Sequence, residues 1–291
     1  MSRRILFPLA CILAACSPDT GADGAVQSAD TAQTVAPSPD TYERSPRRGP
    51  VQVETLSADT GVYSYETVFD DGLSQYPGLY EHVRVMSEAA MAEMARTAEE
   101  DHANWQEAGA DWEWRPYDIG WTWEIVWSDE TRVSVLQSWY EYTGGAHPNH
   151  GSGSILWDVP SQHVVTLPEL FTDGADGSPA MLALLDAVNT GLVAQKRRRL
   201  GESFDEADQT MWTGALTPSA ESLGVFTLAP STRGDQSGGL IFHFDPYAVG
   251  PYAEGSYRIP VAQSVFAPYL ATEWEGVFAG ELNVTDEELQ P

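Results

Sequence analysis

The clearest strand pattern in the chain runs over residues 121–142, which read WTWEIVWSDETRVSVLQSWYEY. Because side chains alternate between the two faces of a strand, the first seven residues place one set on a single face: Trp121, Trp123, Ile125 and Trp127. Ser128-Asp129-Glu130 is typical of a turn, and residues 131–142 can form a second, antiparallel strand. Large aromatic side chains dominate protein cores by area, which favours a covered face, while periodicity alone leaves an exposed tryptophan face open.

Further strands and one long helix are expected on both sides of this hairpin. The helix covers residues 79–107, because apolar side chains recur there at three- and four-residue steps: Leu79, Val83, Met86, Ala90 and Met94. Strand patterns bounded by turn residues lie at residues 51–55, 62–69, 154–159, 162–167, 224–228 and 240–244.

Shorter helices are marked by their starting residues. Ser178 is a good N-cap and Pro179 suits the first helical position, with a buried stripe expected at Met181, Leu185, Val188 and Leu192. A third helix opens with the capping-box pattern at Ser203, and a short helix is expected at residues 261–270. Strands come in runs with helices between the runs, which predicts an α+β fold with mostly antiparallel sheet and helices packed on it. We expect two α+β halves, residues 51–150 and 151–291.

The first fifty residues predict export and lipidation. Arg3 and Arg4 precede an apolar run that is too short to span a bilayer and has the length of a signal-peptide core. The run closes with Leu13-Ala14-Ala15-Cys16, which resembles the lipobox of bacterial lipoproteins. We therefore expect a signal peptide over residues 1–15, a lipid on Cys16 and a disordered tether over residues 16–50. Ser17 favours the periplasmic face of the outer membrane, with the inner membrane or the cell surface left open.

The chain is strongly acidic, with 15 basic and 43 acidic residues and a net charge of −28. Removal of Arg3 and Arg4 with the signal peptide leaves a net charge of −30. Nucleic acid is a poor partner for such a field, because phosphate binding rests on basic side chains. A cationic protein or peptide would be steered towards it, and contact with a membrane is expected through the N-terminal lipid alone.

Catalytic and metal-binding patterns are weak. His147 and His150 flank a loop and His243 lies two residues from Asp245, but zinc needs three or four converging ligands. The Asp173 to Ser178 segment lacks the ligand spacing of a calcium loop and is typical of turns that lead into an N-cap. No nucleophile elbow, phosphate-binding loop or dinucleotide fingerprint is present in the sequence. We therefore expect no enzyme activity, no cofactor and no metal site.

Two segments carry a family resemblance: residues 142–149, YTGGAHPN, and residues 244–255, FDPYAVGPYAEG. Together they resemble motifs of a family of bacterial extracytoplasmic domains of unknown function. That family is shared by the lysozyme-binding part of the anti-sigma factor RsiV and the non-catalytic part of PdaC-type peptidoglycan deacetylases. The chain shows neither a sigma-binding segment nor a deacetylase domain, so the resemblance implies the fold and a binding surface. The candidate binding residues lie in the two loops: His147, Pro148, Asn149, Tyr247, Pro251 and Tyr252.

Three functional hypotheses follow from these observations. The first is a lipid-anchored envelope module that binds a cationic cell-wall-active protein, such as the muramidase lysozyme. The second is a module that binds peptidoglycan fragments or other glycans through exposed tryptophans, with Trp121, Trp123 and Trp127 as candidates. The third is a metal-dependent hydrolase built on His147, His150 and His243.

Overall fold

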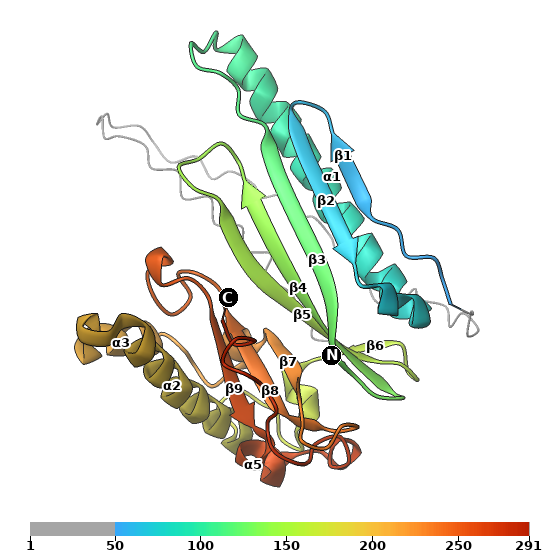
Figure 1. Cartoon of the computed structure of the whole chain (residues 1–291), viewed down its shortest axis with the longest axis vertical. Helices are drawn as coiled ribbons and strands as arrows, with labels where there is room; N and C mark the ends of the chain where they lie inside the picture. Colours follow the sequence, from blue (N-terminus) through green and yellow to red (C-terminus); the bar gives the residue numbers. More distant parts are fainter. Residues whose placement is uncertain (1–49, 291) are drawn as a thin grey trace, which may run out of the picture. The chain divides into compact units, whose positions relative to one another are not determined.

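A six-stranded mixed sheet is the centre of the computed structural model, which describes residues 50–290 (Figure 1). Its strands follow one another in sequence order across the sheet, and all neighbours are antiparallel except the parallel pair β2–β3. The bounds are β1 (Leu56–Asp59), β2 (Tyr63–Phe69), β3 (Tyr117–Ser128), β4 (Arg132–Tyr142), β5 (Asn149–Asp158) and β6 (His163–Val165).

A second, three-stranded antiparallel sheet has the order β7-β8-β9. Its strands are β7 (Phe226–Pro230), β8 (Ser237–Phe244) and β9 (Tyr257–Ala262). The α-helices are α1 (Pro77–Glu107), α2 (Pro179–Leu200), α3 (Glu206–Thr213), α4 (Ala220–Leu223) and α5 (Gln263–Phe266). The 3-10 helices are η2 (Asp71–Gln75), η3 (Leu167–Leu170), η4 (Gly201–Ser203), η5 (Tyr252–Glu254), η6 (Ala267–Tyr269) and η7 (Thr272–Trp274). The predicted α+β class with mostly antiparallel sheet is confirmed.

Helix α1 lies along β1–β3 and covers one face of the large sheet (Figure 1). Its buried stripe runs through Leu79, Val83, Ser87, Met91, Met94 and Ala98. The predicted place of Met86 in this stripe is wrong, because its side chain is 42% exposed. Ser87 takes that place, and its hydroxyl accepts a hydrogen bond of 3.0 Å from the indole N–H of Trp123. A polar residue satisfied by a buried partner is invisible to apolar periodicity.

The tryptophan face of β3 is divided between two cores. Trp123 is 1% exposed and packs under α1, which bears out the expectation of a covered face. Trp127 is also buried, but its packing belongs to the core on the opposite side of the sheet. The prediction that both share one face is wrong there, because the β3–β4 register shifts between Ile125 and Trp127. A bulge of this kind turns the following side chain to the other face.

The largest core lies between the two sheets and α2. Strand β7 contacts β3, β4 and β5, and its Leu228 amide donates to the hydroxyl of Ser134 on β4 at 3.0 Å. Helix α2 packs along β9. It begins where predicted, at the N-cap Ser178, whose hydroxyl accepts a hydrogen bond from the amide of Met181. Residues 50–290 thus form one compact unit that holds all three hydrophobic cores of the described chain.

Three element predictions need correction. The first strand is Leu56–Asp59, whereas the expected segment 51–55 runs as irregular chain with Val51 and Val53 packed on the core under α1. Helix α3 begins at Glu206 rather than at Ser203, because the Asp205 carboxylate accepts from the first-turn amide of Ala207.

The last part of the chain also differs from the prediction. Strand β9 was not predicted, because Pro260 interrupts its strand pattern. The helix expected at residues 261–270 shortens to α5 with η6.

The predicted signal peptide, the lipidated Cys16 and the tether lie outside the described residues, apart from Pro50. Between residues 50 and 290, no helix is both long enough and apolar enough to cross a membrane.

Candidate functional site

The two motif loops meet at one end of the sheets and form an aromatic cluster. Tyr252 is its centre: the His147 ring stacks on it with centroids 4.2 Å apart, and the Tyr247 ring lies at 5.5 Å. The His150 ring approaches Tyr252 edge-on at 5.9 Å. The Tyr252 hydroxyl donates a 2.7 Å hydrogen bond to the carbonyl of Pro148, which fastens one loop to the other. We call His147, His150, Tyr247 and Tyr252 the two-loop cluster.

The remaining predicted binding residues lie at the rim of this cluster. Asn149 opens β5 opposite Glu141 and its side chain is exposed. Pro251 is exposed and precedes the short helix η5 that carries Tyr252. The structure thus brings His147, Pro148, Tyr247 and Tyr252 into direct contact, with Asn149 and Pro251 flanking them.

Asp245 makes a second connection between the two loops. Its carboxylate accepts a 2.8 Å hydrogen bond from the amide of Ser152 on β5. Gly151 is required beside it, because a Cβ there would lie 2.3 Å from Asp245 Oδ2 and 2.5 Å from Trp139 Cζ2. The glycine in the first loop's strand therefore makes room for the aspartate of the second, which a reading of either motif alone does not reveal.

Burial raises the pKa of Asp245 to about 6, against the opposing effect of the Ser152 hydrogen bond. The folded state therefore holds this proton more tightly than the unfolded chain, and the stabilisation is lost as pH rises from about 4 through 6. We expect Asp245→Asn, relative to the wild type, to gain on the order of 2 kcal/mol between pH 4.5 and pH 7.5. Urea unfolding of both proteins at the two pH values measures this change, and a pH-independent difference would contradict it.

Tyr247 is held in a strained and exposed conformation. Asp245 accepts a backbone hydrogen bond from Ala248, with Pro246 second in the turn and Tyr247 third, at a φ of 72°. A type II turn prefers glycine at that third position, so a tyrosine there costs about 1 kcal/mol or more. The Tyr247 side chain is nevertheless 57% exposed. Strained backbone positions of this kind cluster at binding and catalytic sites, which makes Tyr247 a candidate for a functional role.

A buried ion pair supports the second loop from below. Lys196 of α2 is fully buried and its ammonium lies 2.6 Å from the carboxylate of Glu254, which is 8% exposed. The Tyr257 hydroxyl donates to the same Glu254 oxygen at 2.6 Å, and burial raises the pKa of Tyr257, so it stays a neutral donor. The guanidinium of Arg199 donates to the carbonyls of Glu254 and Ser256.

This network was not predicted from the sequence. Lys196 belongs to a run of cations that suits a helix C-terminus, and Arg197, Arg198 and Arg199 do lie in the last turn of α2. Gly250 makes room for this ion pair, because a Cβ there would lie 2.8 Å from the Lys196 ammonium.

His243 is separated from the other histidines by its burial. Its Nε2 lies 2.9 Å from the Thr227 hydroxyl, and burial lowers its pKa to about 3, so the ring is neutral. No group of three or more His, Cys, Asp or Glu side chains within residues 50–290 could hold a metal ion. The hydrolase hypothesis therefore has no ligand set in the described part of the chain.

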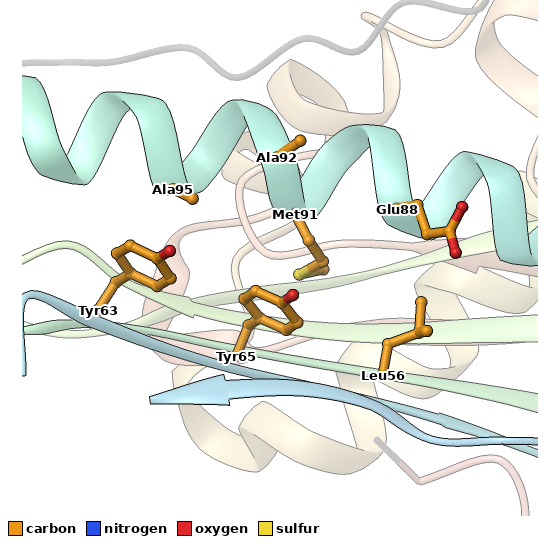
Figure 2. A pocket seen from close by; sticks show the side chains of 7 residues that line it. All are labelled: Leu56, Tyr63, Tyr65, Glu88, Met91, Ala92 and Ala95. Carbon is orange, nitrogen blue, oxygen red and sulfur yellow. The ribbon is translucent and has the colours of Figure 1, made fainter. Parts of the chain in front are cut away.

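A hollow of about 330 Å³ lies between α1 and the first two strands. Figure 2 shows Tyr63 and Tyr65 of β2 pointing towards Met91 and Ala95 of α1. The carboxylate at its rim, Glu88, pairs with Arg84 on the same helix. This arrangement is a gap in apolar packing, with no pair of groups suited to acid–base chemistry.

Comparisons with known proteins agree with the two motifs. Residues 62–150 match the family model described as Deacetylase PdaC, and residues 169–264 match the model described as Protein of unknown function (DUF3298). The loop of His147 lies in the first match and the loop of Tyr252 in the second. No curated protein matches the sequence.

Solved structures add the fold. A member of the DUF3298 family from Bacteroides fragilis NCTC 9343 is 19% identical, with 78% of this chain and 95% of that chain covered and a TM-score of 0.52. A DUF3298 family protein from Pseudomonas aeruginosa PAO1 is 18% identical, with 80% and 98% covered and a TM-score of 0.47. The two family models, together with the fold of the Bacteroides fragilis structure, thus confirm the resemblance carried by the two loops: a segment similar to the PdaC model is followed by a segment similar to the DUF3298 model of unknown function.

Proposed function

We propose that this protein is a lipid-anchored envelope binding module whose two-loop cluster binds a cationic muramidase such as lysozyme. The observation that carries the proposal is the meeting of the two motif loops at Tyr252, which joins His147, Tyr247 and the Pro148 carbonyl in one exposed surface. The choice of a muramidase rests on the family resemblance of these loops.

The cluster has the properties of a protein-binding hot spot. Tyrosine is enriched at such spots because it supplies a large contact area with few rotatable bonds. Proline residues, the Tyr252 hydrogen bond and the Asp245–Ser152 hydrogen bond fix the loops in advance. A surface that is ordered before binding loses less conformational entropy when the partner docks.

Charge complements this geometry. The chain carries a net charge of −28, so a cationic partner is attracted over a distance and a nucleic acid is repelled. A lipid on Cys16 would hold the module at the periplasmic face of the outer membrane, where muramidases act on the wall. This anchor rests on the sequence Leu13 to Cys16.

The electrostatic part is tested by titrating residues 50–291 with lysozyme at low and high salt. We expect the dissociation constant to rise at least about tenfold between 0.05 and 0.5 M NaCl, with most of the change in the association rate. Lysozyme with acetylated lysines is the control and should bind weakly at both salt concentrations. An affinity that does not change with salt would contradict the role of charge.

A further inference from the structure

A second group of aromatic side chains lies where α1 ends and the chain turns back towards β3. His102 stacks on Trp105 with centroids 5.5 Å apart, and Trp114 contacts both rings. Tyr117 also stacks on Trp114, with ring centroids 5.5 Å apart. We call His102, Trp105, Trp114 and Tyr117 the α1-end cluster. Each of these rings contacts at least one other ring of the group, and none belongs to the two-loop cluster.

Hydrogen bonds hold the α1-end cluster in place. The Trp114 indole donates to the carbonyl of Val62 at 3.2 Å, and the Tyr117 hydroxyl donates to the Asp101 carboxylate at 2.7 Å. Burial raises the pKa of Tyr117, which keeps that hydroxyl protonated. The Trp105 indole donates to the backbone carbonyl of Trp112 at 3.1 Å. This last hydrogen bond ties the α1-end cluster to the backbone of Trp112.

Trp112 itself is left uncovered. Its side chain is 65% exposed and makes no ring contact or hydrogen bond with any other residue between 50 and 290. Asp111 and Glu113 flank it, and both side chains are exposed. An exposed indole ring whose two neighbours in the sequence are exposed acids combines one flat apolar surface with strong hydrogen-bond acceptors.

We propose that Trp112 is the stacking platform of a carbohydrate site for β-1,4-linked pyranose chains. All-equatorial pyranose rings expose a flat face of C–H groups that can lie on an indole, and their hydroxyls donate to carboxylates such as Asp111 and Glu113. The Trp112 N–H is free to donate in return. Such contacts need no deep cavity, so an open surface can bind part of a polymer chain.

A protein partner fits this surface less well. Stable protein interfaces bury about 800 Å² on each side, and their cores are depleted of charged residues. Here one exposed ring is flanked in the sequence by two exposed acids, and Asp101 and Glu107 add further negative charge in the last turns of α1. The flat surface of one indole ring is instead similar in size to one pyranose unit.

The test uses residues 50–291, which carry the complete core of the described chain, and two soluble probes. Cellotetraose and the β-1,4-linked tetramer of N-acetylglucosamine are titrated up to about 10 mM, followed by calorimetry and tryptophan fluorescence. Saturable heats with a fluorescence change are expected for at least one tetramer. The ranking of the two tells whether acetamido groups, which wall glycans carry and cellulose lacks, add contacts.

Variants separate this site from the proposed muramidase site. Trp112→Ala should weaken sugar binding at least about tenfold, Trp112→Phe should retain part of it, and Tyr252→Ala should leave it unchanged. Because Trp112 is exposed, its replacement should not alter the unfolding midpoint. Absence of saturable binding to both tetramers, or equal binding by Trp112→Ala and the wild type, would overturn the proposal.

Discussion

Replacing Lys196 by methionine is expected to lower the free energy of unfolding by about 3–5 kcal/mol. The substitution keeps the length of the side chain but leaves the buried Glu254 carboxylate without its ion-pair partner. Tyr257 still donates one hydrogen bond to that carboxylate, which is not enough to offset the loss of the ammonium. Urea unfolding at pH 7, followed by tryptophan fluorescence, measures the difference.

The double variant Lys196→Met/Glu254→Gln is the matched control. It removes both charges while the amide oxygen of the glutamine can still accept from Tyr257. We expect it to recover most of the lost stability, because the damage in the single variant comes from an isolated buried charge. A single variant that loses less than about 1 kcal/mol would show that Glu254 becomes protonated or hydrated at little cost.

Replacing Tyr252 by alanine is expected to weaken muramidase binding about 100-fold, which corresponds to about 2–3 kcal/mol. The ring is the contact shared by His147, His150 and Tyr247, so its removal takes away the centre of the two-loop cluster. It also removes the hydrogen bond to the Pro148 carbonyl that joins the loops. Surface-binding kinetics should show the loss mainly as faster dissociation.

Two further variants distinguish the effect of the Tyr252 ring from that of its hydroxyl and from that of an exposed residue outside the two-loop cluster. Tyr252→Phe keeps the ring contacts and loses the bond to Pro148, so we expect a loss of about tenfold or less. Trp112→Ala should bind the muramidase as the wild type does. Equal affinities of Tyr252→Ala and the wild type would place the interface elsewhere on the protein.

Local patterns predicted the elements whose residues act alone or with near neighbours. The hairpin of β3 and β4 follows from alternation, and the start of α2 follows from Ser178 and Pro179. The prediction failed where a distant partner decides the outcome. Ser87 is buried because Trp123 donates to it, and Trp127 changes face because of a bulge against β4.

The candidate site shows the same division. Both loops were predicted from their motifs, but the sequence carries no sign that Tyr252 bonds to Pro148, 104 positions away. Lys196 resembled an ordinary helix-end cation because its partner Glu254 lies 58 positions further along the chain. The exposed Trp112 lies in the irregular segment before β3, outside the strand pattern that was considered for an exposed face. In that pattern, Trp123 and Trp127 are buried.

The most direct measurement is a calorimetric titration of residues 50–291 into a c-type lysozyme at 0.1 M salt, with muramidase activity followed in parallel. We expect saturable one-to-one binding that Tyr252→Ala abolishes or strongly weakens. No binding at up to about 100 µM of each protein would mean a binding free energy weaker than about −5.5 kcal/mol. That result would contradict the proposed function.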